Sequence, residues 1–187
     1  MLSVKLICVG RMREKFYIDA FAEYQKRLQA YCRLELLEIP EQRLGDRPAE
    51  KEIDAALERE GQEILKAVPA DGYLVALCVE GKQMPSEGMA ALIAAREGSG
   101  KPRLCFVIGG SFGLSPAVKQ RADKRLSMSE MTFPHHLARV MLIEQNANMA
   151  LKTADLACVL ETGTITLRGT GAELLTNEAV KRAYLGE

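Results

Sequence analysis

The chain contains no tryptophan, only two histidines and no Cys-x-x-Cys pair. The two histidines, His135 and His136, are adjacent, so a site with several histidine ligands is excluded. The five cysteines are scattered and odd in number, which is typical of a reducing cytoplasm rather than of a disulfide framework. We therefore expect a cytoplasmic protein without a metal centre.

Long hydrophobic runs and an excess of one charge are also missing. No apolar stretch approaches the roughly 20 residues that a membrane span needs, and the short apolar opening does not resemble a signal peptide, so we expect no membrane association. The 25 basic and 25 acidic residues give a net charge of zero. Binding to nucleic acid by overall charge is therefore disfavoured. A local basic face is still compatible with this composition, because Arg11, Arg13, Lys15, Lys26 and Arg27 cluster near the start.

What is present is an alternation of apolar runs and helical periodicities. Strands are predicted at 3–10, 34–40, 73–79 and 103–108, with a fifth at 126–131. The helices expected between and after them are an apolar stripe from Tyr17 to Tyr31, a segment over 53–68, one capped by Ser86, a short one starting at Pro116, and a long one over 134–155. Because the strands are apolar throughout, we predict an α/β fold, with a mostly parallel sheet and helices on both faces.

The last part of the chain has a different pattern. Residues 157–169 are predicted to form two short strands joined by a Thr-Gly turn, and residues 172–185 a terminal helix. A β-hairpin followed by a helix is an unusual ending for a parallel α/β domain. We interpret it as an appendage, so that the chain would consist of a domain over 1–145 and an extension over 146–187.

The stretch "FVIGGSFGLSP", Phe106 to Pro116, raises the main functional question. It is not a P-loop, which needs a Lys after its last glycine, and its spacing is not that of a dinucleotide fingerprint. The glycines permit either a tight turn without a ligand or a close approach of a ligand to the main chain. Ligands of parallel sheets bind beyond the carboxyl ends of strands, where Gly81, the glycine loop and the segment after Met131 all fall. We therefore expect one site built from three loops.

Two further candidates precede the C-terminal part. Either histidine is a conceivable general base, although a structural role at a helix start is the simpler interpretation of at least one of them. Arg139 and Glu144 are compatible with a catalytic pair or with an exposed pair on one helix.

Four segments together resemble a known family. "VKLICVGRMREKFYIDAFAEYQKRL", "LVALCVEGK", "FVIGGSFGLSP" and "LSMSEMTFPHHLARVMLIEQ" are similar to the ribosomal large-subunit pseudouridine methyltransferases of the SPOUT superfamily (RlmH type), from about residue 3 to 145. The resemblance implies an α/β domain with a deep trefoil knot, an exception to the usual absence of threaded chains. It also implies S-adenosylmethionine as the cofactor, a homodimer whose site is completed across the interface, and a substrate pseudouridine in 23S rRNA, methylated at N3 on assembled ribosomes.

Carried onto this sequence, the family pattern assigns the cofactor site to the three loops expected above. The implied contacts are Leu77, Gly109, Met128, Ser129, Glu130, Met131, Thr132 and Phe133, and we add the neighbouring Gly110. For catalysis we name His135 and Arg139. One departure is Cys78, where the family usually has an acidic residue after the leucine.

The ending is the second departure from the family. In place of the family's tail rich in Tyr, Arg and His, residues 146–187 resemble the end of the ATP-binding subunit of branched-chain amino-acid ABC transporters (LivF type), as in a fusion. This leaves three hypotheses: an active methyltransferase, a cofactor-binding homodimer with weak or no activity because its tail is replaced, or a non-enzymatic interaction module.

Overall fold

A computed structural model describes residues 1–100, 102–144, 157–161, 164–169, 173, 177 and 178. The chain divides into two compact units, Met1–Ile143 and Glu144–Glu187. The first unit contains all the helices and strands up to α5, and the second contains a two-stranded hairpin.

The first unit is a five-stranded sheet with the strand order β2-β1-β4-β3-β5, in which every neighbouring pair is parallel. The strands are β1 (Leu2–Val9), β2 (Cys32–Ile39), β3 (Tyr73–Lys82), β4 (Arg103–Ile108) and β5 (Lys124–Leu126). The helices are α1 (Lys15–Leu28), α2 (Glu50–Ala67), α3 (Ser86–Glu97), α4 (Pro116–Arg121) and α5 (His135–Glu144). The predicted parallel α/β fold is therefore confirmed. The trefoil knot is a separate property of the chain path, and it is implied by the family resemblance.

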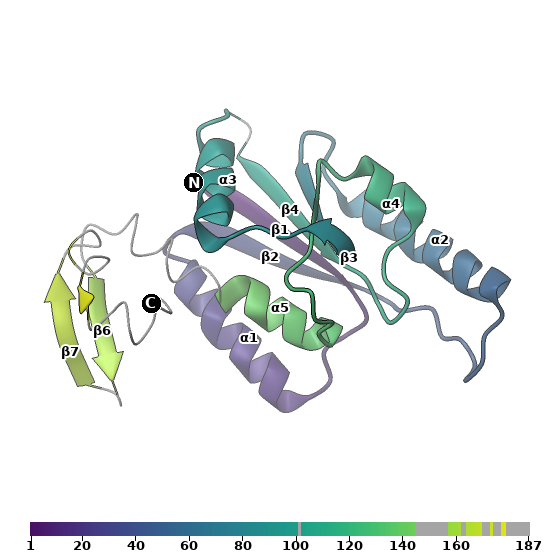
Figure 1. The fold of residues 1–187 in the computed structure, drawn as a ribbon, viewed down its shortest axis with the longest axis horizontal. Coiled ribbons are helices and arrows are strands. Elements are labelled where there is room, and N and C mark those ends of the chain that lie inside the picture. Colours follow the sequence, from purple (N-terminus) through teal and green to yellow (C-terminus); the bar gives the residue numbers. More distant parts are fainter. Residues whose placement is uncertain (101, 145–156, 162–163, 170–172, 174–176, 179–187) are drawn as a thin grey trace. The chain divides into compact units, whose positions relative to one another are not determined.

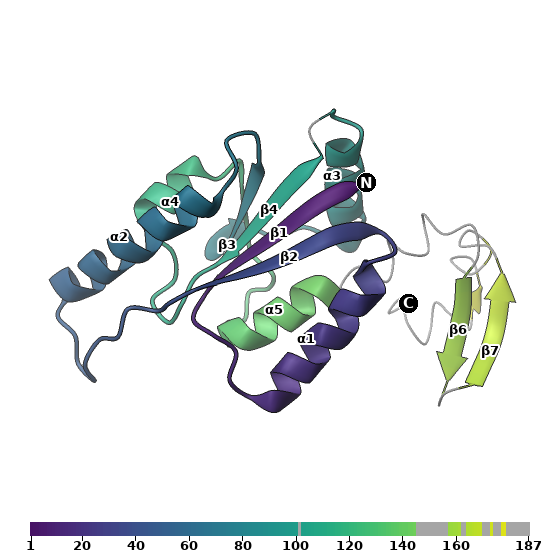
Figure 2. The same ribbon diagram turned by 180° about the vertical axis from the view of Figure 1, so that it is seen from behind.

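Helices cover both faces of this sheet. In Figures 1 and 2, α1, α3 and α5 lie on one face, and α2 and α4 lie on the other. The core beneath α2 and α4 contains residues from alternating positions of the strands, including Ile7, Val9 and Val107. They form one buried cluster with Ile64 of α2 and Val118 of α4. Burying both faces in this way requires the continuous apolar strands that the sequence contains.

Local signals explain most of the helix boundaries. The N–H of Ala49 donates to the Glu52 carboxylate at 2.8 Å at the start of α2. Pro116 opens α4, and the Ser115 hydroxyl accepts from the N–H of Val118 at 3.3 Å, as expected for a proline at the first helical position and a serine cap before it.

Three boundary predictions were wrong. Ser86 is the first residue of α3 rather than its cap, because the cap position is occupied by Pro85. α1 ends at Leu28, so Tyr31 lies outside the helix, and its side chain is 43% exposed. The fifth strand covers Lys124–Leu126 instead of 126–131, because the residues after it form hydrogen-bonded turns of their own: Ser127 Oγ donates to the Ser129 carbonyl, and Ser129 Oγ accepts from the N–H of Met131.

The second unit contains the hairpin that the sequence predicted. β6 (Ala157–Glu161) and β7 (Thr164–Gly169) pair antiparallel, with a register shift between Val159 and Leu160. Most of the predicted terminal helix over 172–185 lies outside the described residues, as does the continuation of the long helix beyond residue 144.

Candidate functional site

The carboxyl ends of β3, β4 and β5 enclose a cavity of about 670 Å³. The parallel order β4-β3-β5 brings these strand ends to one edge of the sheet, where the loops that follow them meet. The main lining segments are 77–80, 108–114, 126–129 and 131–135, with Lys119 and Ala138 completing the wall. The structure thus joins the three loop regions in one cavity.

The glycine loop after β4 is packed against itself. A Cβ on Gly109 would collide with the main chain of Gly113, and one on Gly110 would lie 2.9 Å from a carboxylate oxygen of Glu41 and 3.1 Å from Val9. Gly113 has a φ of +85°, which favours glycine. The two adjacent glycines are therefore required by the shape of the loop itself, and the main chain that they leave bare forms part of the cavity wall.

Glu41, which follows β2, attaches to this loop. Its carboxylate accepts hydrogen bonds from the N–H of Ser111 at 3.2 Å and from the Ser111 hydroxyl at 2.9 Å. Burial is the largest influence on the Glu41 pKa and would raise it, but these hydrogen bonds and the nearby His135 and His136 hold the pKa below its usual range. Glu41 was not among the residues expected from the sequence, because its partner is 70 positions away.

His135 lines the cavity at the start of α5, and its ring lies 4.1 Å from that of His136. Burial, followed by the neighbouring His136 and Arg139, lowers the pKa of His135 below its ordinary value of 6.5. The same causes, burial and then Arg139, lower the pKa of His136. His135 is therefore neutral at pH 7, which is the form that accepts a proton.

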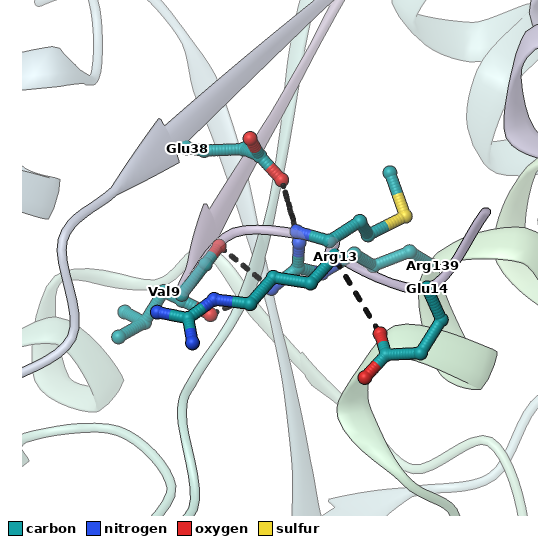
Figure 3. Close-up of polar contacts among 7 residues, drawn as sticks. Val9, Arg13, Glu14, Glu38 and Arg139 are labelled. Atoms are coloured by element: carbon teal, nitrogen blue, oxygen red, sulfur yellow. Dashed lines mark hydrogen bonds and ion pairs between the residues drawn. The ribbon is translucent and has the colours of Figure 1, made fainter. Parts of the chain in front are cut away.

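Arg139 is completely buried and lies one turn after His135. Its guanidinium donates to the Glu38 carboxylate at 3.0 Å, to the Val9 carbonyl at 2.6 Å and to the Gly10 carbonyl at 3.1 Å. Figure 3 shows this cluster, in which Glu38 also accepts from the N–H of Met12 at 2.9 Å. Arg139 thus connects α5 to the ends of β1 and β2.

An ion pair closes another part of the cavity wall. Lys119 of α4 lies 2.6 Å from the carboxylate of Glu80, which follows the buried part of β3. The hydrogen bond from Lys119 is the largest cause holding the Glu80 pKa below its usual value. Cys78, at the position where the family usually has an acid, is a thiol whose pKa is raised mainly by burial.

The sequence-based site residues divide into two groups. Those that line the cavity are Leu77, Gly109, Gly110, Met128, Ser129, Met131, Thr132, Phe133 and His135. Glu130 is exposed and is not among the lining residues, and Arg139 is enclosed by protein groups instead of facing the cavity. The Glu80–Lys119 pair was missed because neither residue carries a signal in the sequence that distinguishes it from other surface charges.

Comparison with known proteins decides the family. The family model described as "Predicted SPOUT methyltransferase" matches residues 2–146. The chain belongs to the SPOUT methyltransferase family. A relative from Bacillus pumilus named "Ribosomal RNA large subunit methyltransferase H" is 42% identical over 144 residues, which cover 77% of this chain and 91% of the relative. The protein of the same name from Streptococcus thermophilus is 44% identical with the same coverage.

Similarity to solved structures is weaker. A SpoU methyltransferase, AviRb from Streptomyces viridochromogenes, was solved with AdoMet; it is 14% identical with a TM-score of 0.38, and the match covers 80% of this chain and 58% of AviRb. This similarity is too low to support an argument. The family match ends at residue 146, so the transporter resemblance of residues 146–187 stays a prediction.

This SPOUT methyltransferase uses S-adenosylmethionine, and the cavity is suited to it. Its volume lies within the ~300–1,000 Å³ that is usual for small-molecule sites. Leu77, Ile108 and Leu114 supply apolar walls, and the bare main chain at Gly109 and Gly110 supplies polar groups without side chains in front of them. Within the described residues, no group of three or more His, Cys, Asp or Glu side chains is arranged for a metal ion. Each helix in the same part of the chain is too short or too polar to cross a membrane.

Proposed function

We propose that this chain, acting in the cytoplasm, methylates N3 of a pseudouridine in the 23S rRNA of the assembled ribosome. The observation that carries the proposal is the match over residues 2–146 to relatives that are named ribosomal RNA large subunit methyltransferase H and are 42–44% identical. The base and the position come from the resemblance described in the sequence analysis. Enzymatic activity is favoured by these matches over a non-enzymatic module or an inactive cofactor-binding dimer.

The cofactor site in this proposal is the cavity at the strand ends. Leu77, Gly109, Gly110 and the residues 128–133 hold S-adenosylmethionine, which supplies a methyl group on a positively charged sulfur. Lys119 neutralises Glu80 at the wall. Glu130 is exposed and lies between two lining residues, Ser129 and Met131. The apolar walls keep water from the reacting atoms.

His135 is the proposed general base. N3 of the target base loses its proton as it accepts the methyl group, so a neutral acceptor is needed beside the cavity. The His135 imidazole lines the cavity, and burial lowers its pKa so that it is unprotonated at neutral pH. Glu41 lies close by: its carboxylate and the Nε2 of His135 are each 3.7 Å from the point where a Gly10 side chain would begin. This negative charge stabilises the imidazolium that forms when the proton arrives.

We also propose a homodimer, as in the resembling family. Large apolar side chains at the cavity are exposed, including Val79 (73%), Met131 (70%) and Phe112 (48%). A second copy of the chain would cover them and complete the site. Sedimentation equilibrium tests this part: a mass near the 20.6 kDa of one chain, at micromolar concentration, would contradict it.

The experiment for the proposed function is methyl transfer from labelled S-adenosylmethionine to purified ribosomes from a strain that lacks the modification. The expected product is one labelled nucleotide in 23S rRNA, identified by mass spectrometry as a pseudouridine methylated at N3. Ribosomes that already carry the methyl group are the matched control. Label in another RNA, or none at all with folded, cofactor-binding protein, would refute the proposal.

A further inference from the structure

The loops after β1 and β2 border the cavity along the same edge of the sheet. β1 and β2 are neighbours in register, and the N–H of Gly10 donates to the Ile39 carbonyl at 2.8 Å, so residues 10–14 and 40–49 leave the sheet side by side. A side chain on Gly10 would begin 3.7 Å from Nε2 of His135, a residue of the cavity wall. A substrate that reaches the cavity therefore passes close to these loops.

Three carboxylates around these loops accept hydrogen bonds from other segments of the protein. Glu38 accepts from the N–H of Met12 and from Arg139, and Glu41 accepts from Ser111. Glu60 of α2 accepts from the N–H of Gln42 at 2.7 Å. These bonds hold both loops in place, while the Glu41 side chain stays exposed.

The arginines of the same loops have the opposite arrangement. All four of them are exposed and, among the described residues, form no ion pair: Arg11, Arg13, Arg43 and Arg47. In Figure 3 the contact between Arg13 and Glu14 runs through the main-chain N–H of Arg13, not through its guanidinium. Glu14, Glu41 and Asp46 are exposed acids in the same loops, so the four arginines and three acids leave a net charge of +1.

From this arrangement we infer that the loops 10–14 and 40–49 are a phosphate-binding edge, through which the protein docks the backbone of its RNA substrate beside the cavity. The inference rests on the proposed RNA substrate. A guanidinium presents two N–H groups that match a phosphate, and it keeps its charge at all relevant pH values. Because the Arg139 cluster and Glu41 already fix the loops, little order has to be gained when RNA binds. A chain with zero net charge thereby presents four exposed guanidinium groups on one surface, none of which is engaged in an ion pair among the described residues.

The test compares full-length double variants, each of which replaces two basic residues by glutamine. Arg11→Gln/Arg13→Gln and Arg43→Gln/Arg47→Gln remove charge from the docking edge. Lys26→Gln/Arg33→Gln removes the same charge from exposed positions at the opposite edge of the sheet, where α1 ends and β2 begins. For each protein, affinity for deproteinised 23S rRNA is measured between about 50 and 200 mM salt, and cofactor affinity by calorimetry.

Each docking-edge variant is expected to bind the rRNA about tenfold more weakly at the lowest salt, with the slope of log affinity against log salt reduced by about 1.5, as for two lost phosphate contacts. Cofactor affinity stays unchanged. The control keeps the wild-type slope. Equal losses in the control and in both docking-edge variants, or no loss in any of them, would overturn the inference. Because RNA affinity is measured separately from methyl transfer, a wild-type protein that binds rRNA through these arginines but methylates nothing would refute the proposed function alone.

Discussion

Gly109 shows how the path of a loop can dictate the identity of a single residue in a site. Since a Cβ at this position would collide with the main chain of Gly113, we expect Gly109→Ala to lower the free energy of unfolding by about 1–3 kcal/mol, as overpacked sites do. The displaced loop should also weaken cofactor binding. Thermal denaturation and calorimetry measure the two effects.

Gly45→Ala is the matched control, because a Cβ at Gly45 meets nothing within 4 Å. It should leave both stability and cofactor affinity close to those of the wild type. If Gly109→Ala were equally harmless, the close contact with Gly113 would not constrain the loop. From the sequence alone, the glycines were compatible with a tight turn or with the close approach of a ligand. The contact of Gly109 with Gly113 could not be predicted, because contacts within a loop depend on its three-dimensional path.

The pH dependence of methyl transfer tests His135. A general base works when unprotonated, and the His135 pKa is lowered, so kcat/KM should rise with pH below 6.5 and be level through neutral pH. His135→Gln should lose this rise and react about 10²–10⁴-fold more slowly, with unchanged cofactor affinity. His136→Gln, whose side chain does not line the cavity, should keep the rise and a near wild-type rate, with the rise moved to higher pH because His136 helps to lower the His135 pKa. An unchanged profile in His135→Gln would exclude it as the base.

The same lowered pKa has a consequence for stability. Below the unfolded value near 6.5 the unfolded chain binds more protons at His135 than the folded chain does, so this residue destabilises the fold as the pH falls through that value.

At the scale of elements, α5 is held to the sheet by a buried charge. Arg139 is fully buried and Glu38 is 25% exposed, so removing one partner leaves the other uncompensated. We expect Arg139→Met to cost about 3 kcal/mol of unfolding free energy in urea denaturation. Arg27→Ala breaks an exposed pair with Glu23 and should cost less than about 1 kcal/mol. Equal effects of the two substitutions would show that the buried cluster does not anchor α5.

The α5 helix also shows the limit of periodicity. Helical spacing places Val140 and Ile143 on one apolar stripe. The buried residues are instead Ala138, Arg139 and Ile143, because Arg139 meets two carbonyls and a carboxylate that come from distant segments. The strands β1 to β4 were predictable because apolar runs can be recognised in the sequence without knowledge of their partners. Glu38, which pairs with the buried Arg139, lies 101 positions away in the sequence, so local spacing could not predict the pair.

For the whole molecule, the meeting of three loops at one cavity could be predicted from the sequence, but the other residues around that cavity only in part. Parallel strands place their carboxyl ends at one edge, which was enough to unite Leu77, the glycine loop and the residues after Leu126. Glu41 binds the glycine loop and Lys119 pairs with Glu80 because of the path of the segments that follow β2 and β4, and this path could not be predicted from the sequence.

Cofactor binding should affect the two compact units of the molecule differently. The described residues that line the cavity all belong to Met1–Ile143, so binding stabilises that unit by linkage, by about 2.7 kcal/mol at a hundredfold excess over the dissociation constant. Hydrogen exchange should then slow at the amides of β1, β3 and β4 and remain unchanged at those of β6 and β7. Equal protection of the hairpin would mean that the two units unfold together, and no protection in either would contradict the location of the cofactor site.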